Sequence, residues 1–182
     1  MGKTQQALEH YEAAEAALAG VGKDPSLDGA GQIRLRYLTA SILNNISLLY
    51  CDLGQWEVAL DHAEQAMALV SDDVGDDHEK ATSFNNLANI YLKLERYDEA
   101  DSTNRKALDI YYRMPSENVH HAAALSTFAS LRFHECDYEG AEAAYEQALA
   151  LTEHFFGKNI DYESIQDSLA HLRSAKDERK ST

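Results

Sequence analysis

Apolar residues recur along the chain at the three- and four-residue spacing of amphipathic helices. In the first such segment, Ala7, Leu8, Tyr11, Ala14 and Leu18 fall on one helical face. The pattern predicts helices over residues 4–19, 32–53, 56–70, 78–94, 97–114, 117–135, 138–156 and 162–176. Alternating, strand-like patterns do not extend beyond a few residues. The sequence therefore predicts an all-α protein.

Residues that favour turns separate these segments. The stretch 20–31 holds four glycines and Pro25, which predicts a loop. Residues 72–77 form an acidic turn, and their carboxylates precede a helix whose dipole favours negative charge. Pro115 breaks the chain again, and Ser116 is placed to cap the helix that follows.

Small and aromatic residues return at a fixed step of 41 residues. The matched rows are Ala59, Ala100 and Ala141; Ala66, Ala107 and Ala148; Trp56, Tyr97 and Tyr138; and Ser47, Ala88, Ala129 and Ala170. A period of this length is typical of stacked helical units, each of which buries one face on its neighbours. Small residues at fixed positions allow adjacent helices to approach closely. The repeat thus predicts a solenoid of helix pairs.

The residues of these rows resemble tetratricopeptide repeats. Leu87-Ala88 with Tyr91, and Ile46-Ser47 with Tyr50, stand where that family has an apolar residue, a small residue and a tyrosine. The common repeat has 34 residues. The longer step here, and the stretch Asn85–Tyr91, resemble the kinesin light chain subtype. The match weakens in the third pair, where Arg132 takes the tyrosine place and Cys136 the place of Gly54.

The resemblance implies a right-handed α-α superhelix (TPR solenoid) of antiparallel helix pairs. It covers residues 32–176, as three TPR-like helix pairs followed by a C-terminal capping helix. Residues 1–20 would be the orphan helix of an incomplete repeat, and residues 177–182 a charged tail that frays. Two readings of the first helix are open: the chain is a fragment of a longer repeat protein, or two chains join as a homodimer through it.

In this architecture the first helix of each pair lines a concave groove. The groove residues that follow from the register are Asn44, Asn45, Leu48, Asn85, Asn86, Asn89, Lys93, Ser126, Ser130, Asp167 and His171. A carboxamide donates and accepts hydrogen bonds at once, so rows of asparagine and serine suit the backbone of an extended peptide. The same side chains could instead bond between neighbouring helices and fix the superhelix. Both roles remain open from the sequence.

Charge narrows the range of partners. The 182 residues carry a net charge of −15, which argues against nucleic acid and anionic membranes, because both select clustered Lys and Arg. No apolar run is long enough to span a membrane, and no signal peptide is evident. Cys51 and Cys136 stand alone, which fits a reduced cytoplasmic setting. A protein or peptide partner is expected.

Candidate chemistry is sparse. The eight histidines show no metal-ligand spacing, and the phosphate-binding and nucleophile motifs are lacking, so neither a cofactor nor a catalytic site is expected. A clamp for a C-terminal carboxylate would have only Lys93 and Arg132, and is not expected. The leading interpretation is a non-catalytic interaction scaffold that holds a peptide or partner segment in its groove. The alternative is a peptide-sensing regulatory module whose curvature responds to the bound peptide.

Overall fold

The computed structural model describes residues 2–22, 24, 26–70, 77–114 and 119–180. This part of the chain is all helical in its regular structure, as predicted. The elements are α1 (Gly2–Val21), α2 (Gly29–Asp52), α3 (Trp56–Leu69), α4 (Asp77–Lys93), α5 (Tyr97–Arg113), α6 (Val119–His134), α7 (Tyr138–Phe156) and α8 (Ile160–Lys180). The predicted acidic turn before Asp77 and the predicted cap at Ser116 lie outside the described residues.

Two helices, α2 and α8, extend beyond a predicted end by three or more residues. Helix α2 begins at Gly29 rather than near residue 32, because Asp28 caps it: the backbone N–H of Gly31 donates to Asp28 Oδ1 at 2.7 Å. Part of the expected loop is therefore helical. Helix α8 continues to Lys180, so residues 177–180 of the expected fraying tail are helical too. The guanidinium of Arg179 lies 5.6 Å from the Tyr138 ring centre, which holds this last turn against α7.

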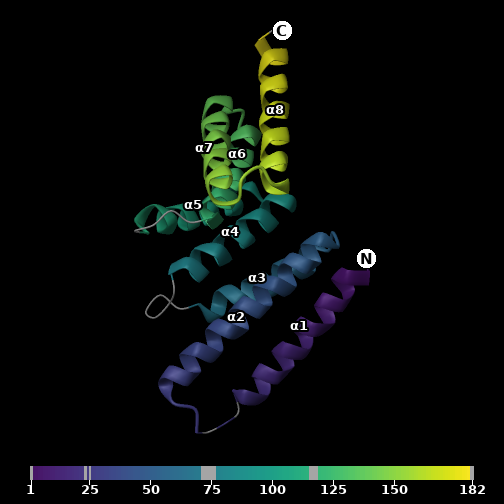
Figure 1. Ribbon diagram of the computed structural model, residues 1–182, viewed down its shortest axis with the longest axis vertical. Coiled ribbons are helices and arrows are strands. Elements are labelled where there is room, and N and C mark those ends of the chain that lie inside the picture. Colours follow the sequence, from purple (N-terminus) through teal and green to yellow (C-terminus); the bar gives the residue numbers. More distant parts are fainter. Residues whose placement is uncertain (1, 23, 25, 71–76, 115–118, 181–182) are drawn as a thin grey trace.

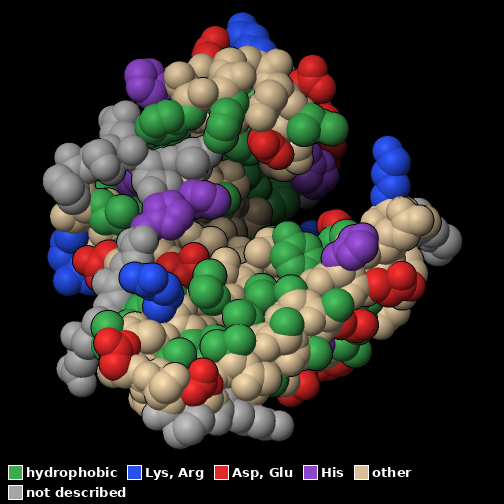
Figure 2. All heavy atoms as spheres, turned by 60° about the horizontal axis from the view of Figure 1, so that its bottom comes forward, with side chains coloured by type: hydrophobic (Ala, Val, Ile, Leu, Met, Phe, Trp, Pro, Cys, Tyr) green, Lys and Arg blue, Asp and Glu red, His purple; other side chains and the backbone are tan. Residues whose placement is uncertain are grey.

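The helices form a right-handed superhelix of antiparallel pairs. The pairs are α2/α3, α4/α5 and α6/α7, with α1 packed on α2 and α8 packed on α7. Figure 1 shows successive pairs turning from one to the next, so that α8 points in a different direction from α1. The first helices also touch along the row, α2 on α4 and α4 on α6. The molecule is hollowed on the face seen in Figure 2.

The small residues of the 41-residue step lie at the helix contacts. Nine of them have no exposed surface: Ser47, Ala59, Ala66, Ala88, Ala100, Ala107, Ala129, Ala141 and Ala148. The exception is Ala170 of α8, which is exposed although Leu169 beside it is buried. Its equivalents are covered by another helix, whereas α8 packs mainly on α7. The register read from the sequence is confirmed for the three pairs.

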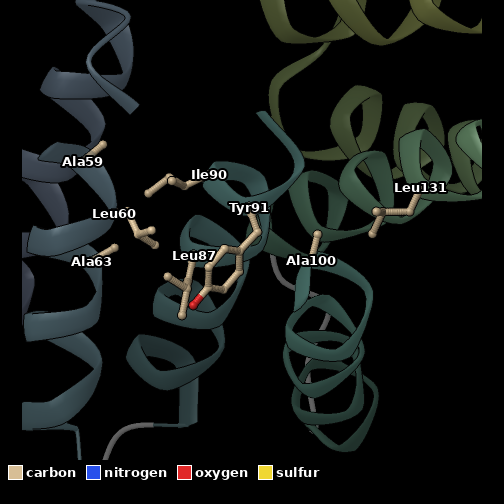
Figure 3. Close-up of a cluster of buried hydrophobic side chains, with 8 residues drawn as sticks. All are labelled: Ala59, Leu60, Ala63, Leu87, Ile90, Tyr91, Ala100 and Leu131. Atoms are coloured by element: carbon tan, nitrogen blue, oxygen red, sulfur yellow. The ribbon is translucent and has the colours of Figure 1, made fainter. Parts of the chain in front are cut away.

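The core runs continuously from one pair into the next. One cluster joins Ala59, Leu60 and Ala63 of α3, Leu87, Ile90 and Tyr91 of α4, Ala100 of α5 and Leu131 of α6. Figure 3 shows these side chains directed toward one another from separate helices. The Ala100 side chain is fully buried where α5 contacts its neighbours, so a larger side chain would not fit there. The cluster therefore links three successive pairs rather than closing within one.

The turn inside each pair has the same geometry with three different residues. Gly54, Glu95 and Cys136 all have positive φ, at 71°, 58° and 62°. In each turn, the N–H one residue later donates 2.9 Å to the carbonyl oxygen five residues back, as from Gln55 to Tyr50. This is the Schellman arrangement that glycine favours. Backbone hydrogen bonds thus hold Glu95 and Cys136 in the left-handed conformation, which is unfavourable for residues other than glycine.

Replacing Ala100 with leucine should destabilise the fold. The added atoms have no free volume at a position with no exposed surface, and overpacking of this kind costs about 1–3 kcal/mol. Chemical denaturation followed by circular dichroism measures the loss. The matched control is Ala143→Leu at an exposed position of α7, which should change the unfolding free energy little. Equal effects at both positions would contradict the packing argument.

Candidate functional site

A cavity of about 640 Å³ lies between the first helices of the later pairs. It is lined by Asn85 and Asn89 of α4, His120, Ala122, Ala123, Ser126 and Thr127 of α6, Thr152 and Phe156 of α7, and Asp161, Ser164 and Ile165 of α8. Figure 2 shows the hollowed face, with histidine side chains at its edge. Three of the expected groove residues, Asn85, Asn89 and Ser126, come together here. A second cavity of about 610 Å³ lies beside α2.

Two of the expected groove asparagines, Asn44 and Asn85, connect neighbouring helices. Asn44 is only 5% exposed, and its Nδ2 donates to Ser83 Oγ on α4 at 2.7 Å. Asn85 is 8% exposed, and its Oδ1 accepts from the hydroxyl of Thr127 on α6 at 3.2 Å. Each bond joins the first helix of one pair to the first helix of the next. These two residues therefore have a packing role, although Asn85 also borders the cavity.

The other expected groove asparagines, together with Leu48, are more accessible to solvent. Asn89 is half-buried and lines the cavity, and no hydrogen bond joins its side chain to another described residue. The Asn45 side chain donates to the carbonyl of Ser41 in its own helix at 2.8 Å. Asn86 is half-buried, and Leu48 is exposed. Of these four, only Asn89 presents an uncommitted carboxamide to the cavity.

The remaining expected residues lie at different distances from the cavity. Ser126 lines it, and its hydroxyl donates to the carbonyl of Ala122. Ser130 is bonded to the Tyr145 hydroxyl at 2.9 Å, which joins α6 to α7. Asp167 and His171 are exposed on α8, and neither lines the cavity. The His171 ring packs edge-on against Phe133.

The two basic residues considered for a carboxylate clamp are placed unfavourably for one. Lys93 is exposed at the end of α4 and does not line the cavity. Arg132 is 14% exposed and pairs with Asp101 of α5 and with Glu135. Its guanidinium also lies 4.9 Å from the Phe128 ring centre. Both of its charged partners would have to be displaced before it could bind a ligand carboxylate.

Histidines from neighbouring helices meet beside the cavity, which the sequence analysis missed. The rings of His78 on α4 and His120 on α6 lie 4.8 Å apart, edge to face. Burial, and secondly the neighbouring His78, lower the pKa of His120. The two positions are 42 residues apart, one more than the repeat step, so periodicity alone would not have paired them. Within the described residues, no group of three or more His, Cys, Asp and Glu could hold a metal ion.

Neither cysteine belongs to the cavity. Cys51 is half-buried, and burial raises the pKa of its thiol to about 11. Cys136 is exposed in the turn before α7. Both are free thiols. Across the described helices, none is both long and apolar enough to cross a membrane.

Comparison with known proteins agrees with the overall fold. Residues 38–113 match the tetratricopeptide repeat family. This match spans α3, α4, α5 and most of α2, which is less than half of the chain. The fold of the chain is that of kinesin-light-chain-like long repeats, as the sequence predicted. The crystal structure of BtubC (BKLC) from P. vanneervenii superposes with a TM-score of 0.72 at 22% identity, covering 96% of this chain and 67% of that one.

Two further structures are similar. A P. anserina protein described as a kinesin light chain with nearly identical TPR-like repeats has a TM-score of 0.65 at 20% identity, covering 99% of this chain and 82% of its own. The first tetratricopeptide domain of Spaghetti (RPAP3), bound to the HSP90 peptide SRMEEVD, has a TM-score of 0.51 at 22% identity. The match covers 74% of this chain and 95% of that one. No functionally curated protein matches the chain in sequence.

Substituting Asn44 and Asn89 tests which of the two asparagines stabilises the packing of the helices. Asn44→Ala removes the buried bond to Ser83, so we expect about 1–2 kcal/mol of destabilisation. Asn89→Ala removes no bond within the described structure and should change stability by less than about 0.5 kcal/mol. Urea denaturation of both variants beside the parent makes the comparison. A larger loss for Asn89→Ala than for Asn44→Ala would reverse these assignments.

Proposed function

We propose that this tetratricopeptide repeat protein is a non-catalytic scaffold that holds an extended segment of a partner protein in the cavity between α4, α6 and α8. The observation that carries the proposal is the uncommitted Asn89 carboxamide in a cavity bordered by successive repeats. A half-buried amide without a partner is poorly satisfied unless water or a ligand bonds to it. A peptide backbone offers the complementary donor and acceptor.

The shape of the site supports an extended ligand. The cavity takes residues from two successive pairs and from α8, so a bound segment would run across the first helices rather than along one of them. Ser126 and Ser164 add hydroxyl groups to the same lining. Contacts to a backbone tolerate many side chains, and such tolerance suits a scaffold. The peptide-bound Spaghetti (RPAP3) domain provides an example of this fold with a peptide.

Charge supports a protein partner rather than nucleic acid. The chain carries −15, and the described residues that line the cavity include neither Lys nor Arg. Phosphate recognition depends on such residues. The two free thiols fit a reduced setting such as the cytoplasm, which is part of the proposal.

A regulatory variant of this proposal rests on the same cavity. Side-chain hydrogen bonds join α4 to the first helices on either side: Asn44 of α2 donates to Glu79 and Ser83 of α4, and Thr127 of α6 donates to Asn85 of α4. A ligand bound to α4, α6 and α8 together could change the spacing of these helices and so the curvature. Small-angle scattering with and without a saturating peptide would detect this as a change in the radius of gyration. An unchanged radius of gyration would contradict the regulatory variant and would leave the scaffold proposal standing.

The test of the scaffold is to remove the groove carboxamides. Asn89→Ala alone should weaken peptide binding with unchanged melting, and the double change with Asn85→Ala should weaken it by roughly tenfold or more. Isothermal titration with the partner segment, beside circular dichroism, gives both readouts. The double variant should also lose some stability, because Asn85 accepts from Thr127. Unchanged affinity in Asn89→Ala would place the binding surface elsewhere.

Self-association is a separate part of the proposal. Helix α1 packs on α2, and Ala13, Ala16, Ala17 and Ala19 are exposed along it. A run of small apolar residues is suited to close helix contact. We propose that two copies can join through this face of α1, and a twofold dimer is the common closed form.

Light scattering over a concentration series tests the dimer. The parent should show a rising mass, and a variant with Ala13→Glu and Ala17→Glu should stay monomeric with the same helicity. A matched control places Glu at the exposed Ala143 and Ala150 of α7. A parent that remains monomeric at every concentration would contradict the dimer and leave the peptide site unaffected.

A further inference from the structure

The cavity has an apolar wall in addition to its asparagines. Phe156 of α7, Ile165 of α8, and Ala122 and Ala123 of α6 belong to its lining. Phe156 is 55% exposed where it borders this open cavity. Ile160, four residues later, is 79% exposed. Large apolar side chains left accessible beside a cavity are typical of binding surfaces.

This wall exists because α7 is longer than its counterparts. Helices α3, α5 and α7 begin at equivalent positions, Trp56, Tyr97 and Tyr138, but have 14, 17 and 19 residues. The additional residues at the end of α7 include Phe155 and Phe156. Gly157, with a φ of 68°, then ends the helix and turns the chain into α8. One 41-residue step from the end of α5 at Arg113 is residue 154, so the two phenylalanines lie beyond the equivalent helix end.

The same corner carries a carboxylate that faces the cavity. Asp161 lies in the first turn of α8, where the helix dipole favours its charge. Its Oδ2 accepts from Asn159 Nδ2 at 3.1 Å, which leaves capacity on both oxygens for further donors. The nearby Lys158 is directed elsewhere: its Nζ lies 3.7 Å from Glu153 Oε1 and packs over the Tyr162 ring.

From these features we infer that the cavity selects a partner segment with a bulky apolar side chain next to a lysine or arginine. The apolar side chain contacts Phe156 and Ile165, and the cation pairs with Asp161. Asn89 holds the adjoining backbone. This inference rests on the proposed function and specifies its ligand. The ligand we infer is an internal segment of another protein, because the described cavity lining has no Lys or Arg to bind a terminal carboxylate.

The test uses three pools of fluorescein-labelled decapeptides with a fixed central pair, Phe-Lys, Phe-Glu or Ser-Lys. Their other positions are degenerate in small and neutral residues. Fluorescence anisotropy with the full chain should rank Phe-Lys tightest. We expect roughly tenfold weaker binding of Ser-Lys and roughly fivefold weaker binding of Phe-Glu. The Lys preference should shrink as salt is added.

Two variants assign the preferences to residues. Phe156→Ser should remove the advantage of Phe over Ser, and Asp161→Asn the advantage of Lys over Glu. Their matched controls are Phe155→Ser, an exposed neighbour outside the cavity lining, and Glu163→Gln, another acidic residue of the same first helical turn. Both controls should keep the ranking of the parent.

The outcomes separate this inference from the proposed function. If all pools bind alike, or Phe-Glu binds tightest, and Asn89→Ala still weakens them, the selectivity is wrong and the scaffold stands. If no pool binds at all, both fail. A third outcome would be that the Phe-Lys pool binds only at low protein concentration, while the mass of the protein doubles at high concentration and this doubling is lost in Phe156→Ser. A second copy of this chain would then occupy the cavity, and the inference would be overturned.

Discussion

Close contact between helices at small residues is the constraint on which the rest of this structure depends. Ala59, Ala100 and Ala141 have no exposed surface, and each lies in the first turn of a second helix, packed against its neighbours. Because those contacts repeat, each pair is turned relative to the last by a similar amount, and the first helices come to share one side. The cavity is a consequence of that regularity. It needs no special fold, only the stacking and a place where a helix departs from the repeat.

That departure is at the end of α7. In a strictly regular solenoid every part of the inner surface would be equivalent, and a ligand would have no preferred position. Here the longer α7 places Phe156 beside α8, and Asp161 and Asn89 face the same volume. An aromatic ring, a carboxylate and a carboxamide thus surround one cavity. Specificity in a repeat protein can arise in this way, from irregular side chains on a regular frame.

The stacking of the helix pairs could be predicted from the sequence, because packing at small residues produces a periodic pattern. The rows through Ala100 and Ala107 gave the register, and both are fully buried. The signal was insufficient for the cavity. Asn44 and Asn89 are both expected in the groove, yet Asn44 bonds to Ser83, whereas no hydrogen bond joins the Asn89 side chain to another described residue. Phe156 lay outside every row, and the approach of His78 to His120 breaks the repeat step by one residue.

The most direct measurement of the central claim is where a peptide lies on the folded chain. A nitroxide-labelled decapeptide pool added to protein with ¹³C-labelled alanine methyl groups would broaden only the methyl signals near the bound label. The account predicts broadening of Ala122 and Ala123, which line the cavity, while Ala143 and Ala150 on the exposed side of α7 stay sharp. Broadening of Ala143 and Ala150 with sharp signals from Ala122 and Ala123 would contradict it.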